Sequence, residues 1–179
     1  MGIAKEQVIW ILCALVAVTA GFMDWRSRRI PNWLTVSGAL LGVAVNTALR
    51  GAHGLEASLL GMLLGLAILF PFVLVRSLGA GDWKLIGAVG AFFGPQQLLV
   101  VLFATILVAG VMALGLIIWK RRLGQTLKNA GHMVLALAQF HLPAADLSID
   151  NPQALKVPFG VAAAIAVVLY TLGHVWGVA

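Results

Sequence analysis

Six apolar stretches dominate the sequence and leave little chain between them. They cover about residues 8–23, 33–49, 59–75, 83–94, 98–119 and 157–178. A bilayer core of roughly 30 Å needs about 20 apolar helical residues per crossing, so stretches of this kind are typical of membrane-spanning helices. A mean hydropathy of +1.02 with only 10% charged residues also lies outside the range of ordinary soluble domains. The sequence therefore predicts an all-α, polytopic membrane protein in which residues 1–179 form one membrane-embedded domain.

The first stretch is expected to remain as a helix rather than to be removed as a signal peptide. Lys5 and Glu6 precede it, it lacks a convincing small-residue cleavage site, and apolar stretches of equal strength follow it. The one cysteine, Cys13, lies inside this stretch. The sequence thus offers neither a disulfide framework nor a paired-cysteine metal site, and we expect no metal and no cofactor.

Positive charge predicts how the chain crosses the membrane. The fourth stretch is short, since twelve helical residues rise only about 18 Å. With six crossings, ten Lys and Arg residues fall in the loops 24–32, 76–84 and 120–156 on one side, against Lys5 and Arg50 on the other. Without the fourth crossing the division is five against seven. The positive-inside rule therefore favours six crossings, with these loops cytoplasmic and both chain ends periplasmic. The ten residues are Arg26, Arg28, Arg29, Arg76, Lys84, Lys120, Arg121, Arg122, Lys128 and Lys156.

Membrane lipid is the partner that the charge predicts. The net charge is +6, but the positive residues lie beside predicted membrane helices and no aqueous module presents them to nucleic acid. Between the fifth and sixth helices, a cytoplasmic loop or surface helix is expected in 120–156, with an apolar face of Leu127, Met133, Val134, Leu137 and Phe140. His132 and His141 there do not have a metal-ligand spacing. The sequence leaves the oligomeric state open.

Two of the six acidic residues stand out by position. Asp24 closes the first predicted helix and Asp82 opens the fourth, so six crossings bring both to the cytoplasmic boundary. Ionisable groups at such depths are candidates for function. Two adjacent carboxyl groups share a proton, so that one can activate water while the other protonates a peptide carbonyl. Alternatively, Asp82 caps its helix and Asp24 pairs with Arg26 or Arg28. The other acids are Glu6, Glu56, Asp146 and Asp150.

Sequence motifs around both aspartates resemble a known family. Gly79-Ala80-Gly81-Asp82-Trp83-Lys84-Leu85 resembles the GxGDxKL signature of bacterial type IV prepilin peptidases. Asp24 shortly before Ile30-Pro31-Asn32 is similar to the first catalytic motif of that family, an Asp shortly before Ile-Pro-Asn. Pro158-Phe159-Gly160 resembles a proline-aromatic-glycine element of its short members, although it also suits an ordinary helix start.

The resemblance implies an inner-membrane aspartic endopeptidase that cleaves the leader peptide of a prepilin or pseudopilin at the cytoplasmic face. Asp24 and Asp82 are then the catalytic pair, and Gly79 and Gly81 shape the site. Pro31 begins the second helix. Asn32 and Lys84 lie within the motifs, where either orients the pair or has a structural role.

The short loop between the first two predicted helices distinguishes the chain from the long members of this family. Long members resemble a fusion of peptidase and methyltransferase with a large cysteine-containing insertion here, whereas only nine residues, 24–32, connect the predicted helices. The chain looks like peptidase-only members that serve Flp-type pili of tight-adherence (Tad) systems. Two alternatives stay open: an ion or proton transporter in which the aspartates relay ions, and a non-catalytic assembly factor for pili or secretion. A relay needs acids or histidines at several depths, but the other acids lie in predicted loops and His174 lies near the opposite side.

Overall fold

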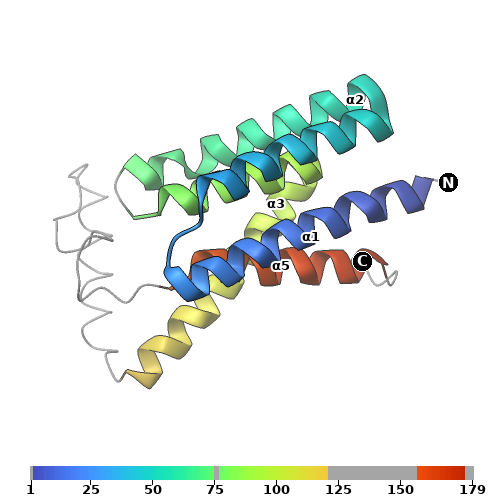
Figure 1. The fold of residues 1–179 in the computed structure, drawn as a ribbon. Coiled ribbons are helices and arrows are strands. Elements are labelled where there is room, and N and C mark those ends of the chain that lie inside the picture. Colours follow the sequence, from blue (N-terminus) through green and yellow to red (C-terminus); the bar gives the residue numbers. More distant parts are fainter. Residues whose placement is uncertain (1, 75–76, 121–156, 176–179) are drawn as a thin grey trace.

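The computed structural model describes residues 2–74, 77–120 and 157–175, which form four helices and no strand. The helices are α1 (Gly2–Ser27), α2 (Asn32–Leu74), α3 (Ala80–Trp119) and α5 (Phe159–Val175) (Figure 1). The all-α prediction is confirmed for these residues. The surface helix predicted within 120–156, with His132 and His141, lies outside them.

Two of the helices are broken by glycines in conformations that other residues rarely adopt. Gly51 has φ 64° and ψ −142° inside α2, and Gly94 has φ 76° and ψ 177° inside α3. At the first break α2 reverses direction, as Figure 1 shows. In the described part of the chain, the four helices therefore comprise six helical segments, each of which overlaps one of the six apolar stretches. By length and apolar composition α1, α2 and α3 can each cross a membrane, whereas α5 has 17 residues. Six crossings remain a prediction.

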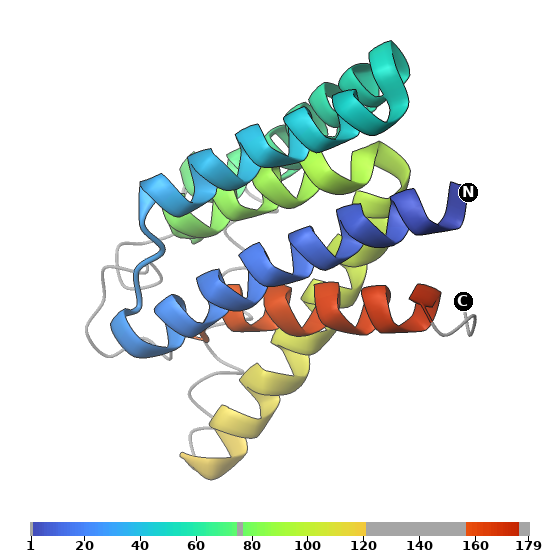
Figure 2. The same cartoon turned by 45° about the vertical axis from the view of Figure 1, so that its right-hand side comes forward.

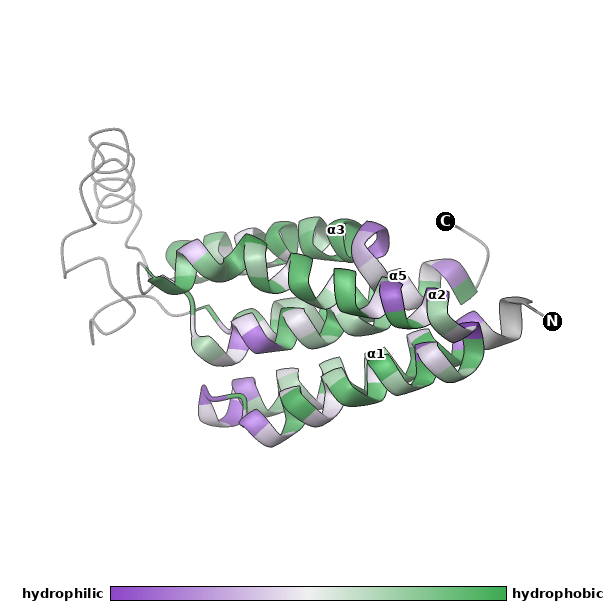
Figure 3. Ribbon diagram, turned by 90° about the horizontal axis from the view of Figure 1, so that it is seen from above, coloured by the Kyte–Doolittle hydropathy of each residue, from purple (hydrophilic) through white to green (hydrophobic). Residues whose placement is uncertain are grey.

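The helices pack in two groups that share α3. The two arms of α2 lie against α3, while α1 packs against α5 and α5 against α3 (Figures 1 and 2). Apolar residues cover the middle of the bundle and hydrophilic residues gather toward its ends (Figure 3). Gly61 and Gly90 bring the backbones of α2 and α3 into direct contact, since a Cβ on either would overlap the carbonyl oxygen of the other. Such small residues permit close helix packing in lipid.

Buried polar side chains stabilise the break in α3. Pro95 has no N–H, so the Ala91 carbonyl lacks its usual helical donor. Ser58 Oγ donates to Ala91 O at 2.7 Å, and Asn46 Nδ2 donates to Ala91 O at 3.1 Å and to Phe92 O at 2.9 Å. Both side chains are at most 1% exposed. An unpaired carbonyl in an apolar environment is costly, so Asn46 and Ser58 hold α2 onto the broken part of α3.

The helices extend beyond the apolar stretches, which changes the setting of both aspartates. Asp24 was expected to close the first helix and to belong to the loop 24–32, but α1 continues to Ser27, so Asp24 lies within its last turn. Likewise α3 begins at Ala80, two residues before Asp82. Helical hydrogen bonds continue into polar sequence at a membrane boundary, whereas hydropathy marks only the apolar part. The predicted start at Leu59 is late for the same reason, because helix resumes after Gly51 through the polar His53 and Glu56.

Candidate active site

Three chain segments meet at the end of the bundle where α1 ends and where α3 and α5 begin (Figure 1). Arg28 N donates to Asp24 O at 2.8 Å as α1 finishes, and Arg28 itself has a φ of 54°. This left-handed conformation turns the chain out of the helix. Pro31 O then accepts from Leu34 N at 3.1 Å, so α2 begins directly after Pro31. Residues 28–31 therefore connect α1 to α2, and Ile30 among them contacts the starts of α3 and α5.

Asp24 is held by the first turn of α5. Its side chain is 7% exposed, and its Oδ2 accepts a hydrogen bond of 2.9 Å from Gly160 N. The N–H groups in the first turn of a helix have no partner within the helix, and the positive end of the helix dipole favours an acidic group. A Cβ on residue 160 would lie 2.9 Å from Asp24 Cβ and 3.0 Å from Asp24 Oδ2. Only glycine fits this approach without displacing Asp24.

Asp82 lies in the first turn of α3 and is half-buried. The two neighbouring glycines leave room on both sides of it. A Cβ on Gly79 would lie 2.9 Å from Asp82 Oδ2, and a Cβ on Gly81 would lie 3.2 Å from Ile30 Cβ. A side chain at either position would therefore press on Asp82 or on the segment that carries Ile30.

Ile30 connects the two aspartates. Its side chain is 8% exposed and packs against Gly81 on one side and Gly160 on the other, where its Cδ1 would lie 3.0 Å from a Cβ. Gly81 precedes Asp82, and Gly160 donates to Asp24. Ile30 therefore lies between the residue that precedes one aspartate and the residue that binds the other. The structure thus brings together Asp24 and Asp82, which lie 58 positions apart in the sequence.

Asn32 and Lys84 bind each other at the edge of this site. Lys84 Nζ donates to Asn32 Oδ1 at 2.9 Å, and the contact is exposed. It joins the first residue of α2 to the second turn of α3. Asn32 and Pro31 also line a groove of about 490 Å³ beside Ile30. Asn32 and Lys84 are therefore hydrogen-bonded to each other beside the two aspartates.

Sequence reasoning missed two residues of the site, Ile30 and Gly160. Both were noted only as parts of motifs, and neither was expected to touch the acids. Their signal was weak, because Gly160 follows a proline and an aromatic residue at a helix start, where such residues are common. Across the described ranges, no three His, Cys, Asp or Glu side chains gather as a metal site would require. The described site therefore offers carboxyl groups, whose chemistry is that of acids and bases.

Fold and site together define a helical membrane protein with an acidic pair at one end of its bundle. The sequence model of the type IV leader peptidase family matches residues 10–114, which is more than half of the chain and includes both aspartates. The chain belongs to this family.

Curated relatives agree with this assignment. The chain is 33% identical over 123 residues to a prepilin leader peptidase/N-methyltransferase of Aeromonas hydrophila, covering 65% of this chain and 40% of the relative. It is 32% identical over 123 residues, with the same coverage, to the protein of that name in Aeromonas salmonicida. The chain thus spans less than half the length of these relatives. No solved structure matches it significantly.

Proposed function

We propose that the protein is an aspartic endopeptidase that removes the leader peptide of type IV prepilins, with Asp24 and Asp82 as its catalytic pair. The observation that supports the proposal is the packing of Ile30 between Gly81, which precedes Asp82, and Gly160, which donates to Asp24. Membership of the type IV leader peptidase family supports the substrate class.

The reaction needs one acidic group to take a proton and one to give a proton. An ionised carboxylate removes a proton from water as its oxygen attacks the carbonyl carbon of the scissile peptide bond, and the protonated partner donates to the carbonyl oxygen. The tetrahedral intermediate then collapses, the C–N bond breaks, and the leaving amine takes up a proton. The hydrogen bond from Gly160 N to Asp24 Oδ2 orients the Asp24 carboxyl group for this role.

The proposed site faces the cytoplasm of a bacterial inner-membrane protein. The exposed side chains of Arg26 and Arg29 lie at the end of α1 beside the acid pair. Toward the other end of the bundle Arg50 is neutralised by Glu6 at 3.1 Å. Positive residues next to membrane helices favour the cytoplasmic side. The arginines there repel a basic leader, so they are better suited to anionic lipid headgroups.

The proposed substrate is an Flp-type prepilin, and the proposed activity is the peptidase alone. Only residues 28–31 separate α1 from α2, whereas the family resemblance implies a large insertion there in the long members. We therefore do not propose N-methyltransferase activity for this chain.

An ion relay has less support than a protease. The polar side chains buried in the described helices, apart from Asp24, are Thr35, Asn46, Ser58, Thr105 and Thr171, none of them an acid or a histidine. Glu6, His53 and Glu56 instead line a polar pocket of about 330 Å³ beside the break in α3. A proton path from that pocket to Asp24 would lack ionisable acids or histidines among these buried groups.

Co-expression with an Flp-type prepilin tests the proposed function. Wild type, Asp24→Asn, Asp82→Asn and the control Glu56→Gln are compared at equal membrane abundance, by gel shift and N-terminal sequencing of the pilin. We expect cleavage by the wild type and by Glu56→Gln, and none by either Asp variant. Processing that survives in either Asp variant would rule out the acid pair. A wild type that cleaves none of several prepilins would instead favour the transporter or the assembly-factor alternative.

A further inference from the structure

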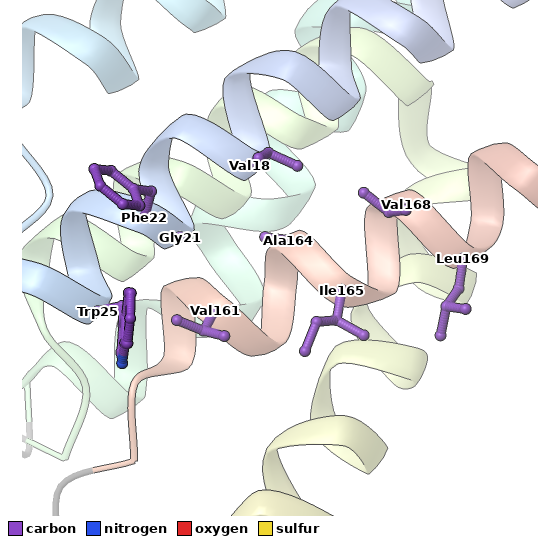
Figure 4. Close-up of a pocket in the computed structure, with 9 residues that line it drawn as sticks. All are labelled: Val18, Gly21, Phe22, Trp25, Val161, Ala164, Ile165, Val168 and Leu169. Carbon is purple, nitrogen blue, oxygen red and sulfur yellow. The ribbon is translucent and has the colours of Figure 1, made fainter.

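An apolar groove runs between α1 and α5 and ends beside the acid pair. Its volume is about 560 Å³. Figure 4 shows Trp25 and Val161 at one end of the groove and Leu169 toward the other. None of the described residues that line it is charged. The lining residues are Val18, Gly21, Phe22 and Trp25 of α1 and Val161, Ala164, Ile165, Val168 and Leu169 of α5.

Small residues form the floor of this groove, and larger ones form its rim. A Cβ on Gly21 would lie 2.8 Å from Ala164 Cβ and 3.1 Å from Gly160 O, so the two helices touch there with no side chain between them. On the rim, Phe22 is 56% exposed and Leu169 is 58% exposed. A floor of small residues lets another helix approach closely in lipid, where packing rather than water exclusion drives association.

The groove is continuous with the candidate active site. Gly21 lies one turn before Asp24 on α1, and Trp25 directly follows Asp24. On α5, Val161 directly follows Gly160, whose N–H donates to Asp24. From Val161 to Leu169 the groove extends for about 12 Å, which corresponds to roughly two turns of helix. A helix in the groove therefore has one end beside Asp24.

We propose that this groove binds the first two turns of the apolar helix that follows the scissile bond of the prepilin, an inference that rests on the proposed function. Such a substrate has a polar leader joined to an apolar helix, with the bond to be cut between them. Seating the start of the helix between Trp25 and Leu169 places the preceding peptide bond next to the acid pair. The uncharged lining suits an apolar helix. Because the groove ends beside Asp24 and the polar leader precedes the apolar helix, the start of that helix is the end that lies next to Asp24.

Filling the groove tests the proposal. Val18→Trp places a large side chain on the groove wall, and Val36→Trp is its control on α2, because the two valines are 49% and 53% exposed and Val36 does not line the groove. We expect Val18→Trp to lower cleavage of the full-length prepilin at least tenfold through a raised KM, with Val36→Trp close to wild type. A soluble peptide that spans the scissile bond without the apolar helix should be cleaved equally by both variants.

A photoreactive residue at position 18 or 36 gives a second readout that does not require turnover. We expect ultraviolet light to join position 18, but not position 36, to co-expressed prepilin. Equal prepilin cleavage by the two Trp variants, or adducts from position 18 to lipid alone, would overturn the proposal. A wild type that cleaves no prepilin contradicts the proposed function instead, whereas normal wild-type cleavage with either overturning result contradicts only the groove.

Discussion

The close contact between Gly160 and Asp24 predicts a large effect from one added methyl group. In Gly160→Ala, the new Cβ would lie 2.9 Å from Asp24 Cβ and 3.0 Å from both Asp24 Oδ2 and Ile30 Cδ1. These separations are too short for carbon and oxygen atoms, so Asp24 or the start of α5 must move by a few tenths of an ångström. That movement lengthens the 2.9 Å hydrogen bond from Gly160 N, which orients the carboxyl group.

The expected losses of activity and stability in Gly160→Ala follow from the weakened hydrogen bond and from the crowding around the new Cβ. A hydrogen bond to a charged group contributes about 1.5–3 kcal/mol, which corresponds to a fall in kcat of roughly ten- to a hundredfold if the orientation of Asp24 is lost. Overpacking lowers the free energy of unfolding by about 1–3 kcal/mol. Most of the kinetic effect is expected in kcat, because residue 160 contacts Asp24 and does not itself line the groove.

Gly110→Ala is the matched control, since a Cβ on Gly110 meets nothing within 4 Å. It should leave cleavage unchanged and stabilise α3 by up to about 1 kcal/mol. Both variants are purified in detergent, and their initial rates of prepilin cleavage and thermal unfolding are measured. A Gly160→Ala protein as active as Gly110→Ala would refute the reasoning that Gly160 positions Asp24.

Three further outcomes are expected. Asn32→Ala and Lys84→Met should each lower the unfolding free energy by about 0.5–1.5 kcal/mol, and because they remove one shared contact, thermal unfolding of the double variant should show little additional loss. Independent, additive losses would mean that the contact at 2.9 Å contributes nothing. Asn46→Leu should destabilise the protein by about 1–3 kcal/mol, because it leaves the Phe92 carbonyl without the Asn46 donor, while prepilin cleavage per folded molecule stays within about twofold. Mass spectrometry of the mature pilin should find a free, unmethylated N-terminus, and a mass increase of one methyl group in cells that hold no other methyltransferase would contradict the peptidase-only proposal.

The sequence predicts the helices well because most apolar stretches are long and the breaks fall at Gly51 and Gly94. The proposed pairing of Asp24 with Asp82 also follows from the sequence, since the predicted topology places both at one boundary and motifs surround each of them. Helix ends are harder to predict from the sequence. Hydropathy marks only the apolar residues, whereas α1 continues through Asp24 to Ser27 in polar sequence. The expected loop position of Asp24 was therefore wrong.

The features that the sequence does not predict depend on contacts between residues far apart in the chain. Gly160 and Asp24 are separated by 136 positions, and no local pattern links a helix start to a distant carboxylate. The role of Asn46 depends on carbonyls that Gly94 and Pro95 leave unpaired in another helix. The groove between α1 and α5 depends on the crossing of two helices at Gly21 and Ala164. Each of these features requires the packing of helices that are far apart in the sequence.

The central claim is that Asp24 and Asp82 act as one catalytic unit, and single-turnover rates of the purified protein test it most directly. Wild type, Asp24→Asn, Asp82→Asn and the double variant are compared on one prepilin, after thermal unfolding has established that all four are folded. Residues that act as a unit are strongly non-additive. We therefore predict that each single variant loses as much activity as the double variant. A single variant that retains a substantial part of the wild-type rate, or losses that add in the double variant, would contradict the account.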